Sequence, residues 1–137
     1  MSFVYERTIR LRDTDAAGVV YFTQFLHFCH EAYEESLSQS GVSLQQLVAP
    51  QDFLLPLVET SGKFFRPLFC GDRIMIELTP QQEQETEFVV HYRLFLGENT
   101  TKPVATAMTR HVCINAETRN RQALSESIQD WINQLTS

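Results

Sequence analysis

The chain has 137 residues, of which 43% are hydrophobic and 20% charged, and its formal net charge is −6. This length suits one globular domain with its own core, and the acidic balance disfavours a general nucleic-acid binder, which carries a basic excess. No stretch approaches the roughly 20 apolar residues of a membrane span. The first residues also lack the pattern of a secretion signal, in which a basic region is followed by an apolar run. We expect a single domain over residues 1–137 in the cytoplasm, with no nucleic-acid or membrane partner.

The first predicted element is a strand from Phe3 to Arg12, in which Phe3, Tyr5, Ile9 and Leu11 share one face with Arg7. A loop from Asp13 to Tyr21 follows, rich in residues that form turns. Apolar residues then recur at helical spacing and predict a long helix from Phe22 to Gln39, with Gly41 as its stop. Ser43 to Gln46 fits a capping box and predicts a short second helix.

The second half of the chain has the period of strands. Four are predicted, at Leu55–Arg66, Arg73–Gln82, Thr86–Leu96 and Pro103–Asn115. A short amphipathic helix with Ile128, Trp131, Ile132 and Leu135 on one face closes the chain. The order predicts an α+β fold, with an antiparallel sheet of about five strands wrapped around one long helix. Because such a sheet has edges that must be covered or paired, we also expect a homodimer or homotetramer.

The three cysteines, Cys29, Cys70 and Cys113, are odd in number and widely spaced. A disulfide framework and a C-x-x-C zinc site are therefore both disfavoured, and three thiols in a reducing compartment are expected.

The loop from Asp13 to Phe22 combines two carboxylates and a glycine, and it ends where the long helix begins. Unpaired N–H groups at a helix N-terminus can polarise a carbonyl, and a nearby carboxylate can attack it or activate water. Acyl transfer or hydrolysis is therefore possible here. The competing interpretation is that Asp and Thr only cap the helix and form the turn.

The segment RDTDAAGVVYF, from Arg12 to Phe22, resembles the active-site loop of the 4-hydroxybenzoyl-CoA thioesterase family. Glu31, the run Phe65-Arg66-Pro67 and the pair Gly71-Asp72 fit later positions of the family. The resemblance implies a hot-dog fold and an acyl-CoA thioesterase that needs no cofactor or metal. It also implies sites that lie between subunits.

Carried over residue by residue, Asp15 matches the catalytic carboxylate, acting as nucleophile or as base for water. Phe22 matches the position whose backbone N–H points at the thioester carbonyl, and Gly18 and Tyr21 would shape the loop. Asp13 would have a supporting role, in which it either orients the loop or only caps it.

Within the family, the runs 19–22, 24–26, 29–34 and 55–58 resemble the cyanobacterial and plastid 1,4-dihydroxy-2-naphthoyl-CoA thioesterases of phylloquinone synthesis. The implied reaction is hydrolysis of that ester to 1,4-dihydroxy-2-naphthoate and CoA. The alternatives are a thioesterase for other aryl or short-chain acyl-CoAs, and a non-catalytic acyl-CoA-binding module.

One stretch departs from the family. Relatives place basic residues for the CoA phosphates near Gln84–Glu87, which is acidic here, so Arg66, Arg119 and Arg121 are the substitute candidates. A solvated basic turn is the competing interpretation for Arg119 and Arg121.

The histidines suggest two further hypotheses. His27 and His30, with Glu31 and Glu34, could share a helix face for a metal, although the H-E-x-x-H arrangement is absent. His91 and His111, on separate strands, could do acid–base work if the fold brought them together, but packing or surface roles are favoured.

Overall fold

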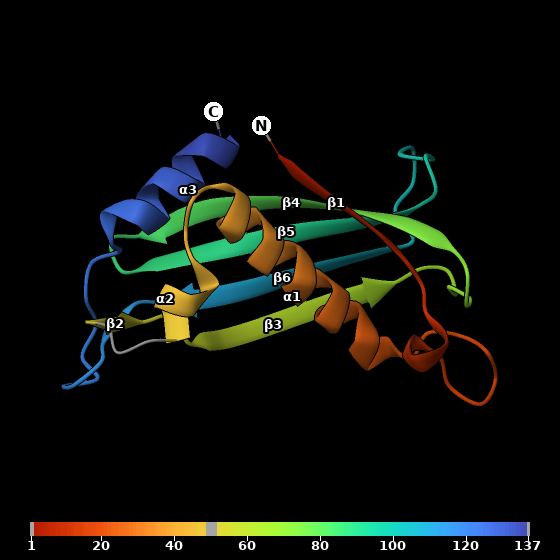
Figure 1. Cartoon of the computed structure of the whole chain (residues 1–137), viewed down its shortest axis with the longest axis horizontal. Coiled ribbons are helices and arrows are strands. Elements are labelled where there is room, and N and C mark those ends of the chain that lie inside the picture. Colours follow the sequence, from red (N-terminus) through yellow and green to blue (C-terminus); the bar gives the residue numbers. More distant parts are fainter. Residues whose placement is uncertain (1, 49–51, 137) are drawn as a thin grey trace.

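The computed structural model describes residues 2–48 and 52–136. Its main sheet is antiparallel with the order β1-β4-β5-β6-β3, and the strands span Phe3–Thr8 (β1), Leu57–Phe64 (β3), Arg73–Gln84 (β4), Glu87–Leu96 (β5) and Ala105–Val112 (β6). Two helices, α1 (Phe22–Gln39) and α3 (Glu126–Thr136), lie on the same face of this sheet (Figure 1). The predicted α+β hot-dog arrangement is confirmed.

The core lies between the sheet and the two helices because alternate strand residues face α1. Ile74, Ile76 and Leu78 of β4 are fully buried, as is Phe28 of α1. Trp131 fastens α3 to α1, since its indole N–H donates to the Ser36 hydroxyl at 3.0 Å. The amphipathic pattern of the last helix therefore reflects packing in this core.

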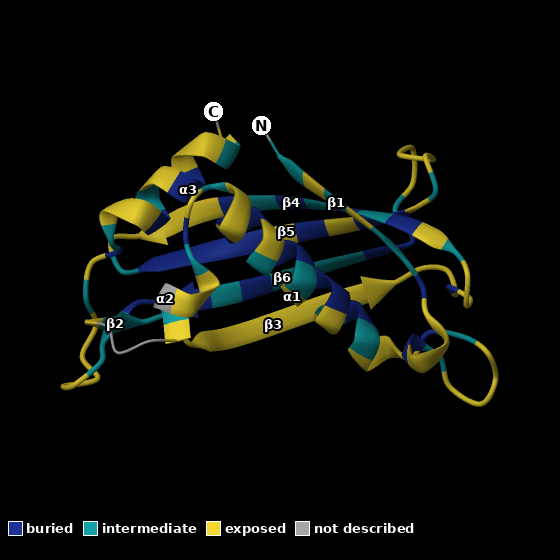
Figure 2. Cartoon of the chain, in the orientation of Figure 1, coloured by how far each residue is buried: buried dark blue, intermediate teal, exposed yellow. Residues whose placement is uncertain are grey.

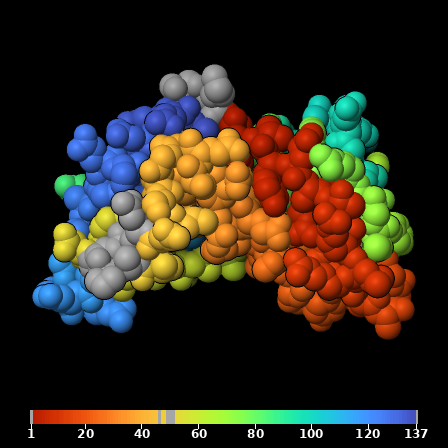
Figure 3. Space-filling model, viewed as in Figure 1, coloured from red at the N-terminus to blue at the C-terminus, as the bar shows by residue number. Residues whose placement is uncertain are grey.

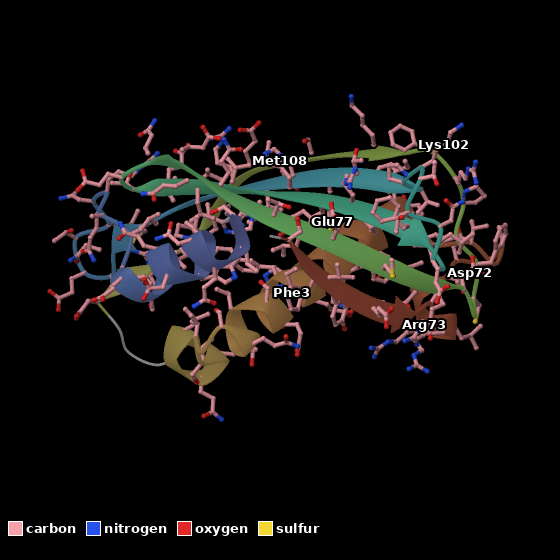
Figure 4. All side chains as sticks on the ribbon, turned by 90° about the horizontal axis from the view of Figure 1, so that it is seen from above. Phe3, Asp72, Arg73, Glu77, Lys102 and Met108 are labelled. Carbon is pink, nitrogen blue, oxygen red and sulfur yellow. The ribbon has the colours of Figure 1, made fainter. Side chains whose placement is uncertain are left out.

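In residues 2–48 and 52–136, no helix covers the opposite face of the sheet. Met108 of β6 points to this outer side, away from α1 (Figure 4). Arg93 pairs with Glu77 across neighbouring strands there, at 2.9 Å. The outer face therefore follows the polar-out alternation expected of a half-covered antiparallel sheet.

Each predicted strand differs from the observed one at one or both ends, and three differences change the local structure. The first strand ends at Thr8, because the chain turns into the 3-10 helix η1 (Leu11–Asp13), which leaves Leu11 78% exposed. The last predicted strand divides after Val112, where the ladder with β5 reaches its end at Glu87. The remaining residues form β7 (Ile114–Asn115), which pairs with β2 (Phe53–Leu54). The strand predicted at Leu55–Arg66 is β3, which spans only Leu57–Phe64. The predicted short helix is α2 (Leu44–Val48); the side chain of Gln46 lies outside the described part.

Strand β3 forms one edge of the sheet, and all eight of its residues are exposed (Figure 2). They include the large apolar residues Leu57, Val58 and Phe64. Its outer edge offers unpaired backbone groups to a further strand. In the part of the chain that the structure describes, no helix is long and apolar enough to cross a membrane.

Candidate active site

The loop between β1 and α1 is a small hairpin-like turn. Thr14 pairs with Val20, and the Asp15 N–H donates to the Val19 carbonyl at 2.9 Å. Gly18 closes the turn by donating to the Asp15 carbonyl at 3.0 Å, with φ of +82°, where residues with a Cβ are strained. Gly18 therefore closes this turn, where its positive φ favours glycine.

The Asp15 carboxylate is exposed, and its own backbone turn holds one of its oxygens. Oδ1 accepts hydrogen bonds from the N–H groups of Ala17 at 2.8 Å and Val19 at 3.4 Å. Among the described residues Oδ2 has no partner. The loop thus fixes the carboxylate while leaving one oxygen available to a substrate or a water molecule.

Helix α1 begins directly after this loop without a side-chain cap. Tyr21 is the N-cap residue, and its carbonyl accepts from the Gln24 N–H at 2.9 Å. In the described residues the N–H groups of Phe22 and Thr23 have no acceptor. These groups and the helix dipole place partial positive charge beside the Asp15 loop, where a carbonyl oxygen can be bound.

A shallow cleft of about 280 Å³ adjoins the start of α1. Aromatic rings form much of its wall: Phe64 lies 6.3 Å from Phe22 and 4.9 Å from Phe25, measured between ring centroids. Its lining residues are Val20, Phe22, Phe25, Phe64, Phe65, Arg66 and Pro67. Asp15 is not among them, so in the described residues of one chain the carboxylate does not line this open cleft.

Asp13 has a different role from Asp15, because it is buried and accepts hydrogen bonds from Arg7 and from the Arg10 N–H. The Arg7 guanidinium also donates to both oxygens of Glu31 at 2.8 Å, and it lies 4.2 Å from the centre of the Phe28 ring. Arg7 therefore ties β1 and η1 to α1. We call Arg7, Asp13 and Glu31 the Arg7 cluster.

The three candidate arginines lie at two ends of the molecule. Arg66 lines the cleft and makes no ion pair in the described residues. Arg119 stands in the turn after β7 with φ of 66°, and Arg121 bonds Glu87 at 3.3 Å. One chain therefore does not bring Arg66 together with the other two.

The histidine hypotheses have different outcomes. His27 and His30 pair separately with Glu31 and Glu34, at 3.5 and 3.1 Å. His91 is exposed on the outer face of β5, whereas His111 is buried on the inner face of β6, so an acid–base pair of these two was wrong. Cys29 beside His30 stays a thiol, because burial raises its pKa to about 12.

A second, larger cavity of about 350 Å³ lies between α1, α2 and residues 53–55, and we call it the α1–α2 cavity. Its lining residues are His30, Tyr33, Glu34, Leu37, Leu44, Leu47, Val48, Phe53, Leu54 and Leu55. Three separate chain segments supply this lining, so no local sequence pattern predicts the cavity. The Asp15 loop lies at one end of the molecule and α2 toward the other (Figure 3).

The comparisons with known proteins agree with this geometry. The family model of the thioesterase-like superfamily matches residues 9–132. A 1,4-dihydroxy-2-naphthoyl-CoA hydrolase from Crocosphaera subtropica is 51% identical over 128 residues, which cover 93% of each protein. Another from Rippkaea orientalis is 50% identical with the same coverage. The crystal structure of a 1,4-dihydroxy-2-naphthoyl-CoA thioesterase from Synechocystis superposes with a TM-score of 0.93 at 44% identity, covering 100% of this chain and 99% of the other.

Proposed function

The chain belongs to the thioesterase-like superfamily and is an acyl-CoA thioesterase, and we propose that it hydrolyses 1,4-dihydroxy-2-naphthoyl-CoA to 1,4-dihydroxy-2-naphthoate and CoA. The observation that carries the chemistry is the position of the Asp15 carboxylate, on a fixed turn directly before the uncapped N-terminus of α1. The proposed acyl group rests on the named relatives, and it places the enzyme in phylloquinone synthesis.

The reaction divides between two groups of this chain. The Phe22 N–H binds the thioester oxygen and stabilises the negative charge that develops when the carbonyl carbon becomes tetrahedral. Asp15 either takes a proton from the attacking water or attacks the carbon itself, giving an anhydride that water then cleaves. In both routes the C–S bond breaks, and the CoA thiolate leaves and takes up a proton.

The proposed assembly is a homodimer built through β3, which can pair further into a tetramer. Its support is the exposed edge of β3 with Leu57, Val58 and Phe64. If two copies pair antiparallel about a two-fold axis, the Phe64 end of one strand lies beside the Leu57 end of the other. The cleft next to Asp15 then faces the far end of a second copy, which supplies the missing wall.

The proposed two-fold axis would also bring the candidate arginines of two copies together. Arg66 lies near the Phe64 end of β3, whereas Arg121 is bridged to Ile114 in the β2–β7 region next to the Leu57 end. Antiparallel pairing therefore brings Arg66 of one copy toward Arg119 and Arg121 of another. We assign these three residues to the CoA phosphates.

The proposed location is the cytoplasm. Cys70 is an exposed free thiol, and Cys29 and Cys113 are buried free thiols. Unbridged cysteines of this kind suit a reducing compartment.

The test is release of CoA thiol from 1,4-dihydroxy-2-naphthoyl-CoA, benzoyl-CoA and acetyl-CoA, with wild type and Asp15→Ala in parallel. We expect fast release with preference for the naphthoyl ester, and a loss of roughly 10²-fold or more in the variant. Asp15-dependent release that favours another ester would reject the substrate and keep the chemistry. Tight binding of the esters without release would make the protein an acyl-CoA-binding module.

A further inference from the structure

A third cavity, of about 340 Å³, lies at the β1 edge of the main sheet, whereas β3 forms the other edge. Strand β1, the segment that leads into η1, helix α1 and strand β4 all contribute to its wall, and Figure 4 shows Arg73 of β4 beside the end of β1. We call it the basic cavity. Its lining residues are Tyr5, Glu6, Arg7, Thr8, Arg10, Arg12, Glu31 and Arg73.

The wall of the basic cavity is rich in positive charge. Four arginines line it, out of 11 lysines and arginines in a chain whose net charge is −6. The lining carboxylates are those of Glu6 and Glu31, and the arginines stay in excess even when the buried Asp13 is counted with them. Such a local excess on an acidic protein attracts an anion.

Both lining carboxylates are already paired with arginines. Arg7 donates to the two oxygens of Glu31 at 2.8 Å, and Arg73 pairs with Glu6 at 3.2 Å. By contrast, the guanidinium groups of Arg10 and Arg12 make no hydrogen bond or ion pair with any described residue, and both residues are exposed. Two unpaired guanidinium groups can neutralise an anion of charge about −2, such as phosphate at neutral pH.

The polarity of the wall favours a compact oxyanion over a larger organic ligand. Six of the eight lining residues are charged, and the other two, Tyr5 and Thr8, carry hydroxyl groups. An aromatic or aliphatic acid would find no extended apolar wall there, in contrast to the phenylalanine-lined cleft at α1. Guanidinium groups bind phosphate oxygens with paired N–H donors, so phosphate matches both the charge and the donors.

The basic cavity is distinct from the cleft at the start of α1, because the two share no lining residue. It lies instead against η1, since the Arg10 N–H donates to Asp13 at 2.7 Å and Arg12 belongs to η1. A phosphate bound by Arg10, Arg12 and Arg73 would therefore join η1 to β4 and stabilise the folded chain at the end of β1.

We propose that the basic cavity is a phosphate-binding site, separate from the thioester cleft, in which Arg10 and Arg12 donate to a phosphate group and Arg73 adds positive charge. This inference goes beyond the proposed hydrolysis, because binding in the basic cavity requires no turnover.

The experiment measures the thermal unfolding midpoint over a series of inorganic phosphate concentrations, with potassium chloride of the same ionic strength as the reference. The wild-type midpoint should rise with phosphate, since a ligand that binds only the folded state stabilises it. In Arg10→Gln/Arg12→Gln the apparent Kd should rise about tenfold or more, because two charged donors are lost. Without phosphate this variant should unfold near the wild-type midpoint. Equal protection of the two proteins by phosphate would overturn the site.

A matched control removes the same number of charges elsewhere. Arg93→Gln/Lys102→Gln changes one arginine on the outer face of the sheet and one exposed lysine after β5, and it should keep the wild-type Kd for phosphate. An equal rise in Kd in this control would reduce the effect to net charge and reject the site.

Arg10→Lys/Arg12→Lys keeps the charge and removes the planar donors, so its Kd for phosphate should rise several-fold. This variant carries the test if the glutamine pair does not fold. Wild-type affinity in the lysine pair would reject binding by the two guanidinium groups.

Thiol release distinguishes free phosphate from a phosphate group of CoA. Free phosphate in the basic cavity should leave the KM of the thioester unchanged. Competitive inhibition by phosphate that Arg10→Gln/Arg12→Gln abolishes would place a CoA phosphate there and overturn the separation from the cleft. Because the unfolding midpoints do not depend on turnover, failure of the proposed hydrolysis is seen separately.

Discussion

Arg7 of β1 donates two hydrogen bonds to the carboxylate of Glu31 on α1, both at 2.8 Å. The same guanidinium, whose side chain is only 8% exposed, also pairs with Asp13. This contact joins β1, the strand before the Asp15 loop, to α1, the helix after it. The spacing between Asp15 and the α1 N-terminus therefore depends on a buried charge cluster beneath the loop.

Removing Arg7 should destabilise the protein strongly. Arg7→Met leaves Asp13 and Glu31 without their shared cation, which predicts a loss of about 3–5 kcal/mol in the free energy of unfolding. Urea denaturation measures it. The control is Arg93→Met, which breaks the exposed pair with Glu77 and should cost less than about 1 kcal/mol. Equal losses of unfolding free energy in the two variants would mean that the Arg7 cluster stabilises the protein no more than an exposed ion pair does.

Asp15→Asn should separate catalysis from folding. Asparagine keeps an oxygen for the N–H groups of Ala17 and Val19, so the unfolding free energy should change by less than about 0.5 kcal/mol. It cannot act as base or anionic nucleophile, so kcat should fall by roughly 10²-fold or more. Asp72→Asn is the matched control, because Asp72 also accepts a backbone N–H in a turn, from Phe69 at 2.9 Å. That variant should keep its activity.

Pairing through β3 predicts different outcomes for the two edge strands. Val58 on β3 and Val4 on β1 are 53% and 49% exposed. Val58→Lys should weaken the dimer and lower activity together, since a lysine at the interface must be desolvated. Val4→Lys should change neither. Sedimentation over a range of protein concentrations, with thiol release on the same samples, decides between the edges; dissociation by Val4→Lys alone would place the interface on β1.

The buried His111 should make stability depend on pH. Burial lowers the pKa of His111 from 6.5 to about 4, so the unfolded chain takes up a proton at a higher pH than the folded one. This contribution to stability is present above pH 6.5 and is lost as the pH falls toward 4. It amounts to about 2 kcal/mol between pH 6.5 and pH 5.

The measurement is the unfolding free energy of wild type and His111→Gln at both pH values. The variant should show a smaller loss on acidification than wild type. His91→Gln, at the exposed outer face of β5, is the control and should follow wild type. Parallel pH profiles for wild type and His111→Gln would contradict the assignment.

Assignment of Arg66 to a CoA phosphate predicts an effect that depends on the leaving group. Arg66→Ala should raise KM for the CoA ester several-fold and weaken the dependence of KM on salt. It should leave the N-acetylcysteamine thioester of the same acid unchanged, because that substrate has no phosphates. Arg93→Ala is the control, at an arginine on the outer face of the sheet. Equal effects on both thioesters would point to a role of Arg66 in the cleft wall.

Local patterns were sufficient for most of the elements. Helical spacing from Phe22 to Gln39 gave α1 with its observed bounds, because the side chains that recur at that spacing are those the core buries. Strand alternation placed Phe3, Tyr5 and Arg7 on one face. The end of β1 was missed because Leu11 continues the alternation in sequence, whereas Asp13 draws the chain into η1 through its hydrogen bond to the Arg10 N–H.

The sequence by itself determined the α+β class, the acidic loop and its carboxylate Asp15, since these depend on residues close together in the chain. Only the tertiary structure decided that Asp13 is buried against Arg7, that His91 and His111 face opposite sides of the sheet, and that β3 is exposed along its length. The α1–α2 cavity also belongs to this second group. The physical reason is that burial and long-range pairing join segments far apart in the sequence, where no local period records the contact.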